Sequence, residues 1–221
     1  MLADVQRGLA RLYDLDLQVS VEDFLCDETE AQALGGVEAT RRGEVLFVVN
    51  EAEGPRVALY VAEKAWRRRE VDWWGPEEAF TATCLGVEGV SHFVYLAFRA
   101  DHEGTVSELE LELQAEVDKW ALGLLGPGTE PQSLLSGQGA AWVRARDRSR
   151  QLRARLYADA AFLDAPESVR GARYRAATRL AARYTEALER QFVDRGAWHA
   201  LSGELRRFYR LGGHQKMDRA G

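Results

Sequence analysis

The chain has 221 residues and a formal net charge of −6, with 46% hydrophobic and 29% charged residues, a composition typical of an ordinary globular protein. It holds no apolar run close to the roughly 18 residues of a membrane span, and its first residues lack the apolar core of a secretory signal, so we expect neither membrane insertion nor export. Cys26 and Cys84 form no CxxC pair, which favours two buried thiols in a reducing cytoplasm over a disulfide or a zinc site.

The charge is divided unevenly along the chain. Residues 140–221 contain 18 Lys or Arg and nine Asp or Glu, whereas residues 1–139 contain the other 11 basic and 26 acidic residues. The two parts therefore carry net charges of +9 and −15. Such a split predicts electrostatic pairing between the parts, within one chain or across a dimer.

The N-terminal part begins with a helical pattern and then shows the clearest β signal in the chain. Apolar residues at helical spacing predict a helix over 4–14. Segments 44–50 and 56–62 are rich in β-branched and aromatic residues and flank a turn-like EAEGP, so they predict a β-hairpin. Residues 37–40 are a candidate third strand, and Pro76 is typical of the first turn of a further helix.

Residues 107–122 combine two patterns. Residues 107–113 alternate glutamate and leucine as a strand would, but the apolar residues of the whole segment recur at helical spacing. Ser107 and Glu110 are typical of a capping box at the start of a helix. We therefore predict a helix in which Glu108 and Glu112 are exposed and the buried stripe consists of Leu109, Leu113, Val117 and Trp120.

The preceding segment, GVSHFVYLAFRA, has its own helical stripe, so together the two segments predict a helical hairpin over 88–125. In an antiparallel hairpin, residues at equal distances from the turn lie opposite each other. The expected pairs are Arg99 with Glu108, Tyr95 with Glu112, and His92 with Glu116.

Residues 126–139 are rich in Gly, Pro, Ser and Gln and lack periodicity, which predicts a linker. The rest of the chain has helical patterns over 140–163, 167–194 and 198–211. Gly212 and Gly213 are expected to end the last of these helices.

The predicted fold class is therefore α+β and predominantly helical. A small antiparallel β-hairpin or meander is packed by helices and followed by a module of about three helices. The expected domains are an acidic α+β module at 1–125 with its β-hairpin at 44–62, the linker at 126–139, and a basic three-helix module at 140–221.

His92, Glu112 and Glu116 are the candidate polar site if the protein is an enzyme. Together a histidine and carboxylates can bind a metal ion or act as an acid–base pair. Helical metal sites commonly contain an ExxH or HxxxH unit, and the sequence has neither. We therefore expect a solvated acidic face, and we assign no catalytic residue, metal ligand or cofactor.

Arginines of the basic part are candidate contacts for phosphate or for a protein partner. Guanidinium groups bind phosphate with two parallel hydrogen bonds and stack on bases. The alternative is that these arginines face water or pair with the acidic part. The candidates are Arg175, Arg179, Arg183, Arg206, Arg207 and Arg210. We expect at least one of the first three beside acids of 1–125, next to an apolar seam of Tyr184, Leu188, Trp198 and Phe208.

Trp66, Trp73 and Trp74 surround a triple arginine in a connecting segment. Tryptophan and arginine dominate interface hot spots, so this cluster is a candidate interface. The equal alternative is that the tryptophans cover the sheet and arginines stack on them.

The sequence contains no GxSxG, P-loop or HExxH motif. The leading hypothesis is a non-enzymatic cytoplasmic protein-interaction or regulatory protein that binds a protein partner or associates with itself. One alternative is a nucleic-acid-binding protein that uses the C-terminal arginines. The other is a metal-dependent hydrolase that uses His92 with Glu112 and Glu116.

Overall fold

The computed structural model describes residues 1–52, 54–67, 70–102, 105–126 and 140–221. Within these ranges the chain is predominantly helical with one two-stranded antiparallel sheet, which confirms the predicted α+β class. None of the described helices has the length and apolar character needed to cross a bilayer. The helices before residue 126 are α1 (Leu2–Tyr13), η1 (Val21–Phe24), α2 (Glu28–Gly35), α3 (Val37–Thr40), α4 (Glu63–Trp66), α5 (Glu77–Asp101) and α6 (Glu108–Leu125). Those after residue 139 are α8 (Ala140–Arg153), η2 (Ala154–Ala158), α9 (Val169–Gln191), η3 (Val193–Arg195), α10 (Trp198–Arg210) and α11 (Gly213–Ala220).

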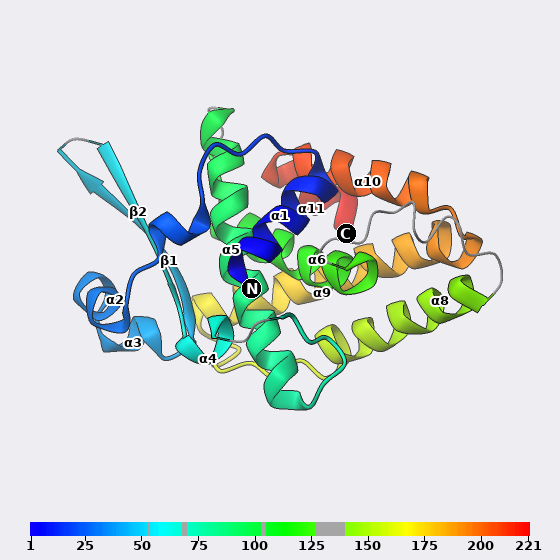
Figure 1. The fold of residues 1–221 in the computed structure, drawn as a ribbon, viewed down its shortest axis with the longest axis horizontal. Helices are drawn as coiled ribbons and strands as arrows, with labels where there is room; N and C mark the ends of the chain where they lie inside the picture. The colour runs from blue at the N-terminus through cyan, green and yellow to red at the C-terminus, as the bar shows by residue number, and fades with distance from the viewer. Residues whose placement is uncertain (53, 68–69, 103–104, 127–139) are drawn as a thin grey trace.

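The predicted β-hairpin is formed by β1 (Glu44–Glu51) and β2 (Gly54–Val61), whose register pairs Glu44 with Val61 at the open end. Figure 1 shows this hairpin projecting at one end of the molecule, with α2 and α3 beside it. The expected third strand at 37–40 is wrong, because these residues form the short helix α3. Gly36 and Gly43 both have positive φ and turn the chain on either side of α3, which leaves no room for an extended segment between them.

The predicted helix over 107–122 is confirmed by α6, and the Ser107 hydroxyl accepts the expected capping bond from the Glu110 backbone N–H at 3.2 Å. Helices α5 and α6 run antiparallel, since Tyr95 near the end of α5 bonds Glu110 near the start of α6, and Ser91 bonds Asp118 further along. The predicted helical hairpin is therefore present. The side chains of Leu113, Val117 and Trp120 are buried as expected, whereas Leu109 is only half-buried.

After residue 139, the structure has the three expected helices and a fourth, α11. The helix predicted over 140–163 ends at Ala158, after the π-helical turn η2. This turn places Leu156 in the core and lets the Tyr157 hydroxyl donate to the Glu116 carbonyl oxygen at 2.9 Å. The glycines expected to end α10 instead introduce α11, which begins at Gly213.

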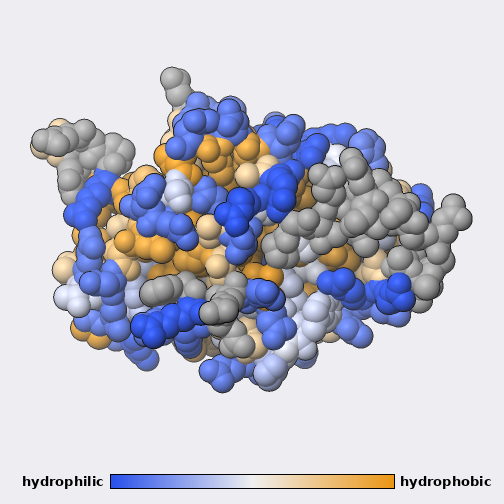
Figure 2. Space-filling model, in the orientation of Figure 1, coloured by the Kyte–Doolittle hydropathy of each residue, from blue (hydrophilic) through white to orange (hydrophobic). Residues whose placement is uncertain are grey.

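One hydrophobic cluster contains side chains from both sides of residues 126–139. Helix α6 packs on α9, and the Trp120 indole donates to the Ser149 hydroxyl at 3.3 Å. The expected apolar seam is buried in this cluster and consists of Tyr184, Leu188, Trp198 and Phe208. On the face shown in Figure 2, hydrophobic residues gather in the middle of the molecule, while hydrophilic residues cover much of its outline. Residues 127–139 lie outside the described part of the chain, so the division into two modules stays a prediction.

Candidate metal centre

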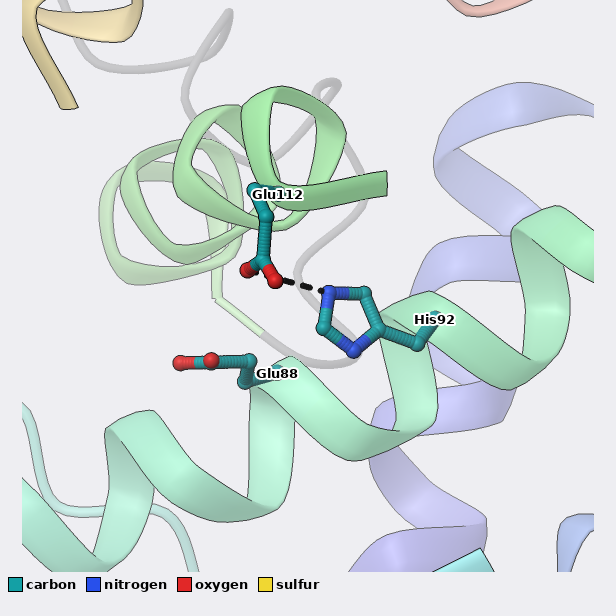
Figure 3. A group of neighbouring side chains, drawn as sticks. All are labelled: Glu88, His92 and Glu112. Carbon is teal, nitrogen blue, oxygen red and sulfur yellow. Dashed lines mark ion pairs between the residues drawn. The ribbon is translucent and has the colours of Figure 1, made fainter. Parts of the chain in front are cut away.

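Helices α5 and α6 and strand β1 bring a histidine and three glutamates together. Glu88 and His92 are four residues apart on α5, so they share one face of the helix, and α6 places Glu112 opposite them. Glu88, His92 and Glu112 each offer a ligand atom, and these atoms all lie within 4.8 Å of one another. Figure 3 shows the His92 ring facing the Glu112 carboxylate of α6, with Glu88 on the same helix as His92. Glu44, at the start of β1, completes the group.

A glycine on α5 explains why β1 reaches this group. A Cβ atom at Gly89 would lie 2.9 Å from Cγ2 of Val61 and 3.0 Å from Cγ of Glu44. Any larger residue would therefore push the open end of the hairpin away from α5. The absence of a side chain at Gly89 allows the Glu44 carboxylate to lie against His92.

The two ring nitrogens of His92 have different surroundings. Nδ1 lies 3.1 Å from Oε1 of Glu44, within hydrogen-bond distance. Nε2 points toward Glu112, but its 3.6 Å separation from Oε2 is too long for a hydrogen bond, and Nε2 has no hydrogen-bond partner among the described residues. The side chain of His92 is only 7% exposed, so water does not replace that partner freely.

The pKa of His92 reflects both burial and its acidic neighbours. Burial alone would lower this pKa, but the Glu44 and Glu112 carboxylates outweigh burial and hold the pKa of His92 well above its usual value. In turn, burial raises the pKa of Glu44 although His92 counteracts it. The two carboxylates therefore favour the protonated form of the ring.

Lys119, on α6, places a second cationic side chain beside this group. Its Nζ atom lies 2.7 Å from Oε2 of Glu88 and 2.9 Å from Oε1 of Glu116. Burial would lower the pKa of Lys119, but Glu116 and Glu88 raise it well above the usual value. Burial raises the pKa of the Glu116 carboxyl, whereas Lys119 and His92 outweigh burial at Glu88 and lower its pKa.

This group carries more negative than positive charge. Four carboxylates face Lys119 and His92, so even with a protonated histidine they exceed the cations by two charges. Of the neighbouring guanidinium groups, that of Arg42 pairs with Asp164, and that of Arg173 pairs with Glu108 and also lies 4.0 Å from Oε1 of Glu112, so it offsets part of this excess. Buried charge is costly unless it is compensated, so a divalent cation would neutralise the excess. The four carboxylates belong to Glu44, Glu88, Glu112 and Glu116.

A pocket of about 520 Å³ is lined by part of this group, namely Glu44, Glu88, Glu116 and Lys119, but not by His92 or Glu112. Its floor includes Glu88, Glu116 and Lys119, and its wall includes Tyr174, an aromatic residue of α9. Burial, and then the nearby Glu112, Glu88 and Glu44 carboxylates, raise the pKa of Tyr174, so its phenol stays neutral. The pocket lining thus includes an uncharged phenol beside these carboxylates. Basic residues that also line the pocket are Arg41, Arg42, Lys64 and Arg155.

The structure brings together two of the three residues in the expected polar site. His92 lies against Glu112, not against Glu116, and Glu116 joins the group through Lys119 and Glu88. Tyr95 correspondingly bonds Glu110 and not Glu112. In both pairs, the observed partner on α6 lies closer to the N-terminus of α6 than the expected partner. The length of the turn alone does not determine how two packed helices are rotated about their axes.

The expected exposure of Glu112 is wrong, since this residue is 7% exposed. Helix α6 packs against α5 on one side and α9 on the other, so both its apolar stripe and part of its acidic face are covered. Glu108, at the first turn, is exposed as expected and pairs with Arg173.

Sequence reasoning missed Glu88 and Glu44. The spacing of Glu88 and His92 is a signal, since ExxxH puts both side chains on one helical face. No comparable signal marks Glu44, which reaches the group only through the packing of β1 on α5.

The cysteines are free, as expected, but only half-buried. Burial raises the pKa of Cys84, on the pocket wall, to about 12, so this thiol is not a reactive nucleophile at neutral pH.

The arginine candidates fall into two groups. Arg206 and Arg210 donate to the carbonyl oxygens of Leu12 and Tyr13 at the end of α1, and Arg207 pairs with Glu204. The contacts of Arg206 and Arg210 join α10 to α1, whereas the Arg207–Glu204 pair lies within α10. A phosphate-binding role for these three side chains stays a prediction.

The second group lies on α9. Arg175 donates to the carbonyl oxygens of Asp164 and Gly171. Arg179 and Arg183 are exposed and have no ion pair within the described residues, so the expected pairing of these arginines with N-terminal acids is not found. The pairs between the two parts instead join Arg173 to Glu108 and Glu112, Arg155 to Glu77, and Arg42 to Asp164. A phosphate-binding role for Arg179 and Arg183 stays a prediction.

The tryptophan candidates are separated by burial. Trp73 is buried, whereas Trp74 is 41% exposed with the Arg148 guanidinium 5.0 Å from its ring centroid. The side chain of Trp66 lies outside what the structure describes.

Comparison of the chain with protein families, curated proteins and solved structures finds no match. The side chains described above are therefore the basis for any functional assignment.

Proposed function

We propose that Glu88, His92 and Glu112 bind one divalent metal ion and that the protein is a metal-dependent enzyme of the hydrolase class. The observation that carries this proposal is the buried Nε2 atom of His92, which has no hydrogen-bond partner in the described residues while Nδ1 is held by Glu44. Histidines that bind metals commonly donate their other ring N–H to a carboxylate, which fixes the tautomer and orients the free nitrogen. The Glu44–His92 contact has that form.

The ligand set favours a particular class of ion. One imidazole and two carboxylates suit Mn²⁺, Fe²⁺ or Zn²⁺ better than an all-oxygen ion such as Ca²⁺. Ligand bonds of about 2.0–2.2 Å require small rotations of side chains whose ligand atoms already lie within 4.8 Å of one another. The three ligands leave coordination positions for water and substrate.

The pocket supplies the place for a reaction. Of the three proposed ligands, Glu88 lines the pocket, and a divalent ion bound beside it would lower the pKa of a bound water and polarise a substrate oxygen. Glu116 lines the same pocket, and burial raises the pKa of its carboxyl toward the range of a general base. Hydrolysis needs these parts together: an activated water, a base and a cavity for substrate.

The test is a titration of the purified, metal-stripped protein with Mn²⁺, with free Mn²⁺ followed by electron paramagnetic resonance. We expect one bound Mn²⁺ ion, and we expect His92→Ala and Glu112→Gln each to weaken binding by at least about tenfold. Glu110→Gln is the matched control, since Glu110 is a buried carboxylate on the same helix that bonds Tyr95 and not His92. Failure of the wild-type protein to bind Mn²⁺, Fe²⁺ and Zn²⁺, or unchanged binding by His92→Ala, contradicts the metal centre.

The second candidate is the cytoplasmic interaction or regulatory protein predicted from the sequence. Exposed hydrophobic side chains favour it: Trp74, Leu163 and Val169 are 41%, 82% and 86% exposed. Tryptophan is among the residues that are enriched in interface hot spots. Size-exclusion chromatography with light scattering measures self-association directly, and Trp74→Ser would reduce it if this tryptophan lies in the contact.

A further inference from the structure

Lys119 shares a carboxylate with the proposed metal centre. Glu88 supplies one of the three ligand atoms of that centre, and its Oε2 atom also lies 2.7 Å from Nζ of Lys119. Glu116 holds the same ammonium from the other side at 2.9 Å. The side chain of Lys119 is 7% exposed, so this position is enclosed and not a mobile surface charge.

This arrangement has the layout of a two-cation centre. In two-metal enzymes, two cations about 3.5–4 Å apart share ligands and stabilise opposite sides of a reacting group. Here the second position, between Glu88 and Glu116, is filled by the Lys119 ammonium. A second metal ion would have to displace that ammonium and break both ion pairs.

Glu88, the carboxylate common to both positions, lines the pocket, whereas the other two proposed ligands, His92 and Glu112, do not. Glu88, Glu116 and Lys119 line its floor, and the Arg42 guanidinium lies 5.2 Å from the centroid of the Tyr174 ring in its wall. Two neighbouring cations, together with hydrogen-bond donors around them, would bind an anionic oxygen more tightly than they would bind a neutral group.

Building on the proposed metal site, we propose that Lys119 is the second cation of a one-metal centre, and that the metal ion and the ammonium together bind an oxyanion group of the substrate. The substrate class is therefore an oxyanion such as a phosphoryl compound. Lys119 would touch that group directly, whereas Glu116 positions the ammonium.

The probe is inorganic phosphate, measured by the Mn²⁺-induced relaxation of its ³¹P signal in the presence of the Mn²⁺-loaded full chain. We expect one Mn²⁺ ion per chain and strong relaxation at bound phosphate. Lys119→Met should keep the Mn²⁺ ion and weaken phosphate binding by at least about tenfold, the effect of removing a charged hydrogen-bond donor.

Two further variants make this test decisive. Lys64→Met is the matched control, because Lys64 is an exposed lysine lining the same pocket but not held by Glu88 and Glu116, and it should keep phosphate binding. Lys119→Met leaves Glu88 and Glu116 without their cation and could prevent folding. In that case the double variant Glu116→Gln/Lys119→Met, which removes one negative and one positive charge together, is used to measure phosphate binding.

The outcomes separate this inference from the proposed function. Absence of Mn²⁺ binding by the wild-type protein overturns the metal centre itself. Binding of two Mn²⁺ ions, no phosphate relaxation in the Mn²⁺-loaded protein, or wild-type phosphate binding by the Lys119 variants overturns the role of Lys119 and leaves the metal centre standing.

Discussion

His92 is the residue on which the candidate site depends, and its chemistry is set by Glu44. A buried imidazole held by a carboxylate at Nδ1 presents Nε2 in a fixed direction, toward Glu112. Protons and metal ions compete for that nitrogen, because the acidic neighbours that raise the pKa of His92 also attract a cation. Metal binding should therefore release protons and strengthen as pH rises.

Glu44→Gln tests the orienting carboxylate. The amide oxygen can still accept from Nδ1, but the negative charge that favours this tautomer and makes the ring more basic is lost. We expect Mn²⁺ affinity to fall by about 10–100-fold, the usual effect of removing such a partner, with helical content unchanged. Isothermal titration calorimetry and circular dichroism measure the two quantities. Unchanged affinity would show that Glu44 serves the fold alone.

At the scale of elements, the site exists because a hairpin and two helices approach closely. Gly89 permits the approach of β1 to α5, while Asp118 ties α6 to α1 and α5. Its carboxylate accepts hydrogen bonds from Tyr13 and, at 2.6 Å, from Ser91. Each of these positions affects the site through the placement of an element, without touching the proposed metal ion.

Gly89→Ala should separate the hairpin from α5. The new Cβ atom would lie 2.9 Å from Val61, closer than real Cβ contacts, and in a tight contact of 3.0 Å with Glu44, so we expect a loss of about 1–3 kcal/mol in the free energy of unfolding and weaker Mn²⁺ binding. Gly203→Ala is the control, since no atom lies within 4 Å of its Cβ position in α10, and it should stabilise by about 0.5–1 kcal/mol. Urea unfolding gives both values. Equal effects at the two glycines would refute the packing argument.

Asp118→Asn should change how stability depends on pH. Burial raises the pKa of Asp118 to about 6 from 3.8, although Ser91 and Tyr13 counteract it. Between these two pH values the folded protein binds more protons than the unfolded chain, so stability falls as pH rises. Relative to Asp118→Asn, the wild-type protein should lose about 2 kcal/mol between pH 4 and pH 7. Urea unfolding at both pH values measures this, and a pH-independent difference would contradict it.

At the scale of the whole molecule, the acidic and basic parts are joined mainly by a shared apolar core. Ion pairs such as Arg173 with Glu108 cross between them, but partly exposed pairs contribute only about 0–1 kcal/mol each. The larger contribution comes from buried side chains where α6 packs on α9. The charge difference along the sequence therefore does not by itself hold the molecule together.

A single core predicts cooperative unfolding. We expect circular dichroism and tryptophan fluorescence to report coincident transitions in urea, because Trp120 and Trp198 lie in the same cluster on opposite sides of residues 126–139. High salt should shift the midpoint only slightly. Two separated transitions would instead support two independently folding modules.

The sequence by itself determined the features that depend on neighbours along the chain. Helical spacing and the Ser107 cap indicated α6, and β-branched runs around a turn indicated the hairpin. Only the tertiary structure decided which acids are buried. Glu112 looks solvent-exposed in the isolated helix, but α5 and α9 cover it, and Glu44 joins His92 from 48 residues away. Local patterns give a helix its faces, whereas the long-range packing of other elements decides which face is removed from water and which charges meet there.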